Sequence, residues 1–400
     1  MRDFIKKHRI LIALLIIMGI CGLGIAAYEG AFYYVPSMKQ GEKKIGLVIT
    51  TIEDNESDLL IYDENLNLQR QKRLHYAGLG ASLARCPIAN QQIFLETTGI
   101  SGVGIIEEFI AIHLEKETIA KYPVSHKTAL TAVAANQNYA YAVSNLNGTS
   151  TLTQHRHLDK KEIAVKKFSD LLIEMVAANE DYVFLAISSA DSSRTINFIT
   201  VLNANSLDTI REIPISREEY GKFAWNNYLL TEEALYLPFP LSSKAWVVDE
   251  ESKNKTGKEK DIYDPRKEEA KLNNKILKLS LKDFSFSMIE LARKAPRRIE
   301  KKGDFLFVIQ ENQFYKDAYL TIYNEITGKQ DIYVWEDMFF LNFAISDNEL
   351  YVVGLDSKVG YSYIYRYEIS EDNQITFKNK KLLPDIVTGM YVYEKEEAEK

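Results

Sequence analysis

The stretches ANQNYAYAV (135–143) and ANEDYVFLA (178–186) are nearly the same, and their asparagines lie 43 residues apart. In both, a short polar tip is followed at once by an apolar run. Similar segments begin at Ala89, Thr231, Lys301 and Ser346. Asn and Asp suit the left-handed backbone conformation of tight turns, so we interpret the tips as structural hairpin turns. A repeat of this length is typical of one supersecondary unit in a repeat architecture.

A second pattern, in which a polar turn joins two strands, occurs seven times. Its turns are marked by Asp63, Glu115, Asp159, Asn203, Lys282, Asn324 and Ser370. Successive markers are 52, 44, 44, 79, 42 and 46 residues apart. Two hairpins per unit form a four-stranded antiparallel sheet, and seven such units do not divide naturally into sandwiches. The pattern therefore predicts an all-β fold, a seven-bladed β-propeller of four-stranded antiparallel blades.

The interval of 79 residues contains a highly charged stretch at 249–274, with 8 acidic and 7 basic residues. Such a stretch cannot bury a core, which indicates an insertion in one blade. Near the two chain ends, the predicted strand at 44–51 has no predicted strand before it to pair with, and the predicted strand at 388–394 has none after it. We therefore predict that 390–393 pairs with 45–51 and closes the ring, because closure removes exposed sheet edges. The propeller then spans 44–393, and 394–400 is a charged tail.

Composition limits the class of protein. The chain has 46% hydrophobic and 26% charged residues, with 24 Tyr, 18 Phe and only 9 Pro, which favours strands over disorder. Its net charge of −7 argues against a nucleic-acid partner, because phosphate binding relies on clustered Lys and Arg. Cys86 is the only cysteine beyond Cys21, so the predicted propeller cannot form an internal disulfide.

The N-terminus resembles a membrane-inserting segment. Basic residues within 1–9 precede an uncharged run at 10–27, whose 18 residues lie between the length of a signal-peptide core and that of a spanning helix. Aromatic residues in the following linker (28–43) suit a membrane interface and favour an uncleaved transmembrane anchor over a cleaved signal peptide. Positive charge on the short side predicts a cytoplasmic N-terminus and an extracytoplasmic main domain in a single-pass membrane protein.

Residues 44–393 resemble, in blade period, the divergent seven-bladed propeller superfamily, in particular the quinoprotein-like and WD-repeat-like propellers of exported bacterial proteins. The Gly-His/Trp-Asp pairs and the sialidase-type boxes of such propellers are missing. Three tryptophans, Trp225, Trp246 and Trp335, are too few for the docking repeats of quinone enzymes. The resemblance therefore transfers no site residue, and we expect no cofactor.

Motifs that could carry chemistry are weak. His155 and His157 lie two apart on a predicted strand and could share a metal ion, but no matched ligands lie nearby, and we interpret them as part of a solvated outer strand. Serines at 187–194 lack a nucleophile turn, and the Gly-rich stretches at 78–85 and 99–104 precede no helix that could bind phosphate. We therefore expect no metal site and no catalytic residues.

The remaining candidates are residues on links between second and third strands, where propellers usually bind ligands. They are Asn145, Asn147, Arg194, Phe239, Trp246, Phe314, Tyr315 and Tyr361. Aromatic residues and Arg on loops are typical of protein or peptide recognition. The leading hypothesis is a membrane-anchored binding or scaffold module for a protein, peptide or envelope polymer. The alternatives are a propeller-type lactonase, lyase or glycosidase with its site at the central channel, and an accessory or sensor subunit of a membrane complex.

Overall fold

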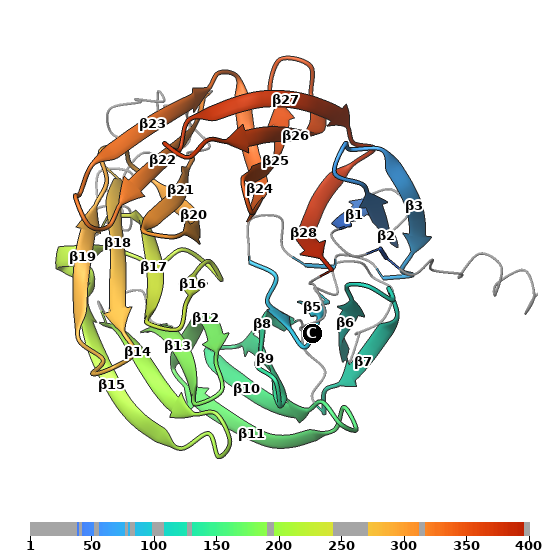
Figure 1. Cartoon of the computed structure of the whole chain (residues 1–400). Coiled ribbons are helices and arrows are strands. Elements are labelled where there is room, and N and C mark those ends of the chain that lie inside the picture. The colour runs from blue at the N-terminus through green and yellow to red at the C-terminus, as the bar shows by residue number, and fades with distance from the viewer. Residues whose placement is uncertain are drawn as a thin grey trace, which may run out of the picture.

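The computed structural model describes residues 38–39, 42–51, 56–76, 79–80, 85–97, 108–125, 130–189, 196–242, 271–311 and 317–395. These residues form seven four-stranded antiparallel sheets arranged as a ring around a central channel (Figure 1). The fold is therefore an all-β seven-bladed propeller, as the spacing of the repeats predicts. All seven predicted turn markers lie at or beside the hairpin between the third and fourth strands of a blade.

Blades are numbered here along the chain, and each is given from its inner to its outer strand. Blade 1 is β28 (Ile386–Glu394), β1 (Lys43–Thr51), β2 (Glu56–Tyr62) and β3 (Leu68–Arg73). Blade 2 is β4 (Ile88–Ala89), β5 (Gln92–Leu95), β6 (Glu108–His113) and β7 (Ile119–Pro123). Blade 3 is β8 (Leu130–Ala135), β9 (Tyr139–Leu146), β10 (Thr149–Arg156) and β11 (Glu162–Ser169). Blade 4 is β12 (Leu171–Ala178), β13 (Tyr182–Ser189), β14 (Ile196–Asn203) and β15 (Thr209–Ser216).

A one-turn helix, α3 (Arg217–Tyr220), follows blade 4 and is capped by the Ser216 side chain. Blade 5 is β16 (Leu229–Leu230), β17 (Ala234–Leu241), β18 (Leu272–Ser280) and β19 (Phe286–Glu290). Blade 6 is β20 (Pro296–Lys302), β21 (Phe305–Gln310), β22 (Ala318–Asn324) and β23 (Gln330–Trp335). Blade 7 is β24 (Met338–Ser346), β25 (Glu349–Asp356), β26 (Tyr361–Ile369) and β27 (Ile375–Leu382).

The core is divided into seven apolar clusters, one at each interface between neighbouring blades. Alternate side chains of a strand point to opposite faces of its sheet, so a middle strand feeds two clusters. In β13, Val183 and Leu185 pack toward blade 3, whereas Phe184 and Ala186 pack toward blade 5. Burial on both faces explains why the strand sequences are continuous apolar runs.

The repeated tips ANQN (135–138) and ANED (178–181) join neighbouring blades. Asn136 Nδ2 donates a hydrogen bond to the Asn179 carbonyl at 2.8 Å, and Gln137 N donates to Glu180 Oε1 at 2.9 Å. Residues 43 apart in the sequence are therefore in contact. Asn136 also caps its own turn, because its Oδ1 accepts hydrogen bonds from Asn138 N and Tyr139 N.

The expected left-handed conformation at the tips holds for only some of them. Asn90 in blade 2 and Asp347 in blade 7 have a φ of 50°, as expected for a tight hairpin turn. Asn136 and Asn179 are not among the residues with positive φ. They stabilise three-residue turns through their side chains instead, which is the other common role of asparagine in turns.

The ring closes through the predicted pairing of the chain ends. β28 is hydrogen-bonded to β1 in an antiparallel register that includes Ile45 with Val392 and Leu47 with Met390. The last strand therefore completes the first blade and occupies its inner position, beside the channel (Figure 1). This prediction is confirmed, together with its register near 390–393.

Two sequence predictions concern residues outside those that the structure describes. The predicted anchor at 10–27 lies outside them, and within the described ranges no helix is long and apolar enough to cross a membrane. The predicted insertion at 249–274 lies mostly outside them as well, although its last residues, Leu272 to Asn274, form the start of β18.

The pairing of β28 with β1 leaves no room for a side chain at Gly46. This residue lies opposite Tyr391 across the β1–β28 pair, and a Cβ atom built on it would lie 2.0 Å from Tyr391 Cζ. We expect Gly46→Ala to lower the free energy of unfolding by about 1–3 kcal/mol, measured by urea denaturation, because overpacking a core displaces its neighbours. The double variant Gly46→Ala/Tyr391→Leu should cost less than the sum of the two single variants. Additive costs would contradict this account of the closure.

Candidate functional site

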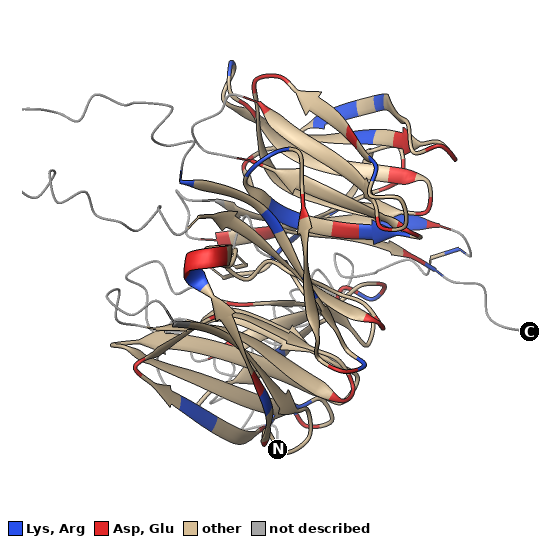
Figure 2. Ribbon diagram, turned by 90° about the vertical axis from the view of Figure 1, so that its left-hand side faces the viewer, with Lys and Arg blue, Asp and Glu red and all other residues tan. Residues whose placement is uncertain are grey.

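The two ends of the blades carry connections of very different length. In blades 2 to 7, the turn between the first and second strands spans two or three residues. Links between second and third strands are longer in several blades: β5 ends at Leu95 and β6 begins at Glu108, while β17 ends at Leu241 and β18 begins at Leu272. We call the end with the long links the loop face and the opposite end the turn face. Figure 2, a side view, shows acidic and basic residues mixed over the blades, with α3 at one edge.

Of the eight residues predicted to form a binding surface, four are described by the structure. Asn147 lies in the exposed turn between β9 and β10, and Tyr361, the first residue of β26, is 57% exposed. Both lie at the loop face, as expected from their place between second and third strands. Arg194, Trp246, Phe314 and Tyr315 lie outside the described residues.

Asn145 and Phe239 have structural contacts instead. Asn145 Nδ2 donates hydrogen bonds of 3.0 Å to Thr131 Oγ1 and to the Ile173 carbonyl, so it links blade 3 to blade 4. Phe239 was predicted on a link, but it lies within β17 and is fully buried in the cluster between blades 4 and 5. The physical reason is that β17 extends to Leu241, and its alternation places Phe239 on a buried face.

The prediction that His155 and His157 lie on a solvated outer strand is wrong, because β10 is the third strand of blade 3. His155 is fully buried, with the Phe109 ring edge-on at a centroid distance of 5.0 Å, so β10 is not a solvated strand at this point. His157 Nδ1 lies 2.9 Å from Tyr122 Oη, and its Nε2 lies 2.9 Å from the Asn136 carbonyl. Burial lowers the pKa of His157. Both rings therefore pack between blades 2 and 3, and among the described residues no group of three or more His, Cys, Asp or Glu could hold a metal ion.

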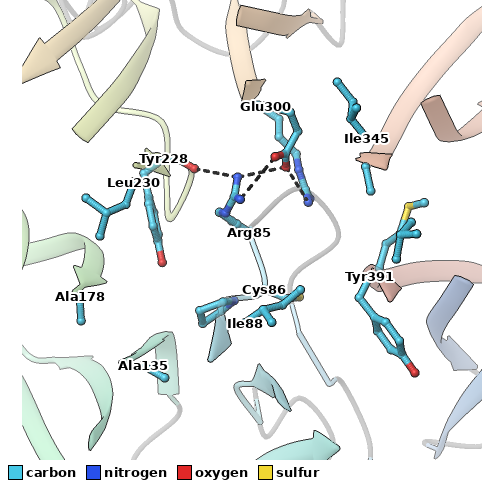
Figure 3. A pocket seen from close by; sticks show the side chains of 15 residues that line it. Arg85, Cys86, Ile88, Ala135, Ala178, Tyr228, Leu230, Glu300, Ile345 and Tyr391 are labelled. Atoms are coloured by element: carbon cyan, nitrogen blue, oxygen red, sulfur yellow. Dashed lines mark hydrogen bonds and ion pairs between the residues drawn. The ribbon is translucent and has the colours of Figure 1, made fainter. Parts of the chain in front are cut away.

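A cavity of about 250 Å³ lies in the central channel (Figure 3). All seven inner strands contribute to its wall, and so do the residues just before β4. This segment lies in the middle of the ring and leads directly into β4, which is only two residues long. Farther back along the same link, Gly80 has a φ of 69° and packs so closely on β28 that a Cβ atom would lie 2.5 Å from the Thr388 carbonyl oxygen.

Arg85 crosses the channel from blade 2 to blades 5 and 6. Its backbone N–H donates to the Asn226 carbonyl at 3.1 Å. Its guanidinium donates to Glu300 Oε1 at 3.0 Å and, more weakly, to the Tyr228 and Ile299 carbonyls at 3.4 and 3.3 Å. Figure 3 shows Arg85 between Tyr228 and Glu300. The arginine therefore ties three blades together across the axis of the ring.

A second guanidinium shares the same carboxylate. Arg298 Nη2 lies 3.8 Å from Glu300 Oε1, and its Cζ lies 5.8 Å from the centroid of the Phe343 ring. Burial lowers the pKa of Arg298 to about 10, which leaves it charged at neutral pH. Arg298 and Glu300 are two residues apart on β20, so their side chains point to the same face of the sheet.

Three buried carboxyl groups lie toward the loop-face end of their blades. Glu96 and Glu311 directly follow the second strands of blades 2 and 6, and burial raises their pKa values to about 7 and about 8. Glu174 on β12 also has a raised pKa because of burial, although Lys222 Nζ lies 3.4 Å from its Oε1. Cys86, which lines the cavity, is buried, and its pKa is raised to about 12, so the thiol is protonated at neutral pH.

Sequence reasoning missed this channel cluster. Arg85, Arg298 and Glu300 come from two parts of the chain that are more than 200 residues apart, and no local motif joins them. The available signal was the high charge of RRIEKK (297–302), where five of six residues are charged, which is unusual for an inner strand. Its meaning depends on which strand is innermost, and that is a property of the closed ring.

The comparisons with known proteins support the fold and no specific family. No protein-family model matches the chain, and no curated protein matches it significantly. Among solved structures, it is similar to the periplasmic gluconolactonase of Pseudomonas aeruginosa, with a TM-score of 0.58, 9% identity and coverage of 88% of this chain and 99% of that one. It is also similar to the β-propeller domain of the trilobed protease from Pyrococcus furiosus (TM-score 0.51, 10% identity, coverage 87% and 94%). A WD40 domain from Neurospora crassa is similar too (TM-score 0.51, 10% identity, coverage 86% and 99%).

The raised pKa of Glu311 predicts a dependence of stability on pH. Burial is the main cause, and Arg297 and a backbone hydrogen bond at Phe340 partly oppose it. The folded state holds this proton up to about pH 8, whereas the unfolded chain releases it near pH 4.3, so its contribution to stability is lost as pH rises between these values. Between pH 5 and pH 9 we expect the free energy of unfolding of Glu311→Gln to rise relative to that of the wild type by about 4 kcal/mol.

Urea denaturation at both pH values measures this difference. Glu371→Gln is the matched control, because Glu371 is exposed and the change should be the same at both pH values. A Glu311→Gln difference that does not vary with pH would show that Glu311 ionises normally in the folded protein.

Proposed function

We propose that this protein is a binding module that recognises a protein, a peptide or an envelope polymer through its loop face. The observation that carries the proposal is the asymmetry of the connections. Thirty residues separate Leu241 from Leu272 and twelve separate Leu95 from Glu108 at the loop face, against two to five in the hairpin turns at the other end. Long links on a rigid scaffold are where binding residues concentrate.

The chemistry of the described residues supports binding over catalysis. The Arg85 guanidinium is engaged by Glu300 and by backbone carbonyls, the Cys86 thiol is buried and protonated, and His155 is packed between aromatic rings. Within the described part of the chain, none of these side chains forms a pair of nucleophile and general base. The similar structures include a gluconolactonase as well as a WD40 domain, but at about 10% identity they support only the fold.

The proposal includes a membrane anchor at 10–27, which holds the propeller on the outer side of the membrane. It rests on the sequence alone: an uncharged run of 18 residues follows a basic segment, and positive charge stays on the cytoplasmic side. An anchor would keep the loop face within reach of ligands on the cell surface.

The role of the loop face can be tested by replacing 244–269 with a short Gly-Ser linker, and separately by Tyr361→Ser. Two exposed residues of the turn face, Leu158 and Ile326, provide matched controls as Leu158→Ser and Ile326→Ser. A partner is first cross-linked to the full chain in envelope extract and identified. Its affinity for each purified variant is then measured. We expect the loop replacement to weaken binding at least about tenfold, with both controls unchanged, because hot-spot side chains contribute most of the affinity.

The opposite pattern, with weaker binding in the turn-face controls and unchanged binding in the loop-face variants, would refute the assignment of the surface. Circular dichroism of all four variants checks that a loss of binding does not come from unfolding.

The anchor makes a separate prediction. The full chain should sediment with membranes and resist extraction at alkaline pH, because the apolar run lies in the hydrocarbon core. A variant lacking 1–27 should be recovered in the soluble fraction. The intact mass of the membrane-bound protein distinguishes an uncleaved anchor from a cleaved signal peptide. Recovery of the full-length chain in the soluble fraction would contradict the anchor.

A further inference from the structure

A groove lies on the side of the ring between blades 6 and 7. Its volume is about 510 Å³, within the range of about 300–1,000 Å³ that is typical of ligand sites. β23, β26 and β27 line it, and Figure 1 shows β23 and β27 on the outside of the ring. None of its lining residues belongs to a link between second and third strands, so it is distinct from the loops of the loop face. Five of its eight lining residues are aromatic: Tyr333, Trp335, Tyr365, Tyr367 and Phe377.

The aromatic rings of the groove hold one another in place. The Tyr365 and Tyr367 rings are stacked, with centroids 6.4 Å apart and an interplanar angle of 22°, and the Trp335 ring lies 5.9 Å from that of Tyr367. Both tyrosines are 8% exposed and form the floor, whereas Phe377 is 52% exposed and lies at the rim. A ligand therefore meets a preformed surface, which lowers the entropy cost of binding.

Most polar groups of these rings already have partners. Trp335 Nε1 donates a hydrogen bond to Tyr367 Oη at 2.8 Å. Tyr333 Oη donates to Gln374 Oε1 at 3.0 Å and accepts from Ile375 N at 3.2 Å. The groove therefore offers a ligand mainly the surfaces of its rings.

Lys380 is the one charged residue of the lining. Its Nζ lies 4.4 Å from the centroid of the Tyr363 ring and 5.6 Å from that of Tyr365, and these contacts position the ammonium without neutralising it. Within the described part of the chain it has no carboxylate partner, whereas the neighbouring Lys378 is paired with Glu368. The groove therefore combines aromatic surface with one positive charge, which favours an acidic ligand over a basic one.

We propose that this groove binds a proline-rich peptide segment of a partner protein, with an acidic residue beside Lys380. A polyproline II segment suits the groove because proline has no backbone N–H, presents an apolar ring and is ordered before binding. Aromatic-lined grooves are a recurring mode of recognising such segments. A sugar chain suits it less, because its hydroxyls would lose water at about 1–3 kcal/mol each with few partners besides the Tyr365 hydroxyl and Lys380. The site goes beyond the proposed loop-face function and does not depend on it.

The test uses the full chain in detergent and a fluorescent peptide of three Pro-Pro-Glu repeats, with binding followed by fluorescence polarisation. Phe377→Ser removes a ring at the exposed rim, so we expect affinity to fall about tenfold. Lys380→Glu reverses the charge, so affinity should fall about fivefold for this peptide and rise for one of three Pro-Pro-Lys repeats. Val165→Ser and Lys167→Glu are the matched controls, because both residues are exposed on β11, the outer strand of blade 3.

Further probes test the nature of the ligand. A peptide of three Ala-Ala-Glu repeats and a hexamer of N-acetylglucosamine should both fail to bind saturably, because the first lacks proline and the second is a sugar chain. Replacing 244–269 with a Gly-Ser linker should leave the affinity for the Pro-Pro-Glu peptide unchanged, which separates this site from the loop face. Circular dichroism identifies a variant that does not fold.

Absence of saturable binding by the Pro-Pro-Glu peptide, or equal affinity in a folded Phe377→Ser variant, would overturn the proposal. Saturable binding of the sugar in its place, lost in Phe377→Ser, would overturn it in favour of a saccharide site. A dimer of the full chain that dissociates in Phe377→Ser, seen by analytical ultracentrifugation, would overturn it in favour of a second copy as the occupant.

Discussion

The pairing of β28 with β1 is the constraint on which the rest of the structure depends. Each blade buries both faces against its neighbours, so all seven apolar clusters form only when the ring is closed. Two of them, those on either side of blade 1, include residues of both chain ends, such as Leu47 and Met390 in one and Val48 and Tyr391 in the other. The hydrogen bonds of β28 also remove an exposed strand edge, which would otherwise invite association with another chain.

Closure also creates the channel and determines what can lie in it. The inner strands bring Arg85 within 3.0 Å of Glu300, although the two residues are 215 apart in the sequence. This contact joins opposite parts of the ring, and buried polar contacts of this kind tend to specify one arrangement as much as they stabilise it. Arg298 belongs to the same cluster, because its Nη2 lies 3.8 Å from Glu300 Oε1.

The two ends of the ring are suited to different tasks. Short turns at the turn face are fixed by contacts between neighbouring tips, such as that of Asn136 with Asn179, and they surround the opening of the channel cavity. The loop face carries the long links, where changes in length cost little because the blades beneath are already closed. The two ends of the ring therefore differ in the length and the fixation of their connections.

The sequence by itself determined the blade count, the turns and the closing strand, because these depend on local alternation and on a repeat of about 44 residues. It also predicted that links between second and third strands share one face, where Asn147 and Tyr361 are exposed. Only the tertiary structure decided which side chains are buried. Phe239 and His155 lie on strands whose two faces are both covered, which no single strand reveals. The channel cluster was likewise decided by the ring, because Arg85, Arg298 and Glu300 meet only after distant blades are placed side by side.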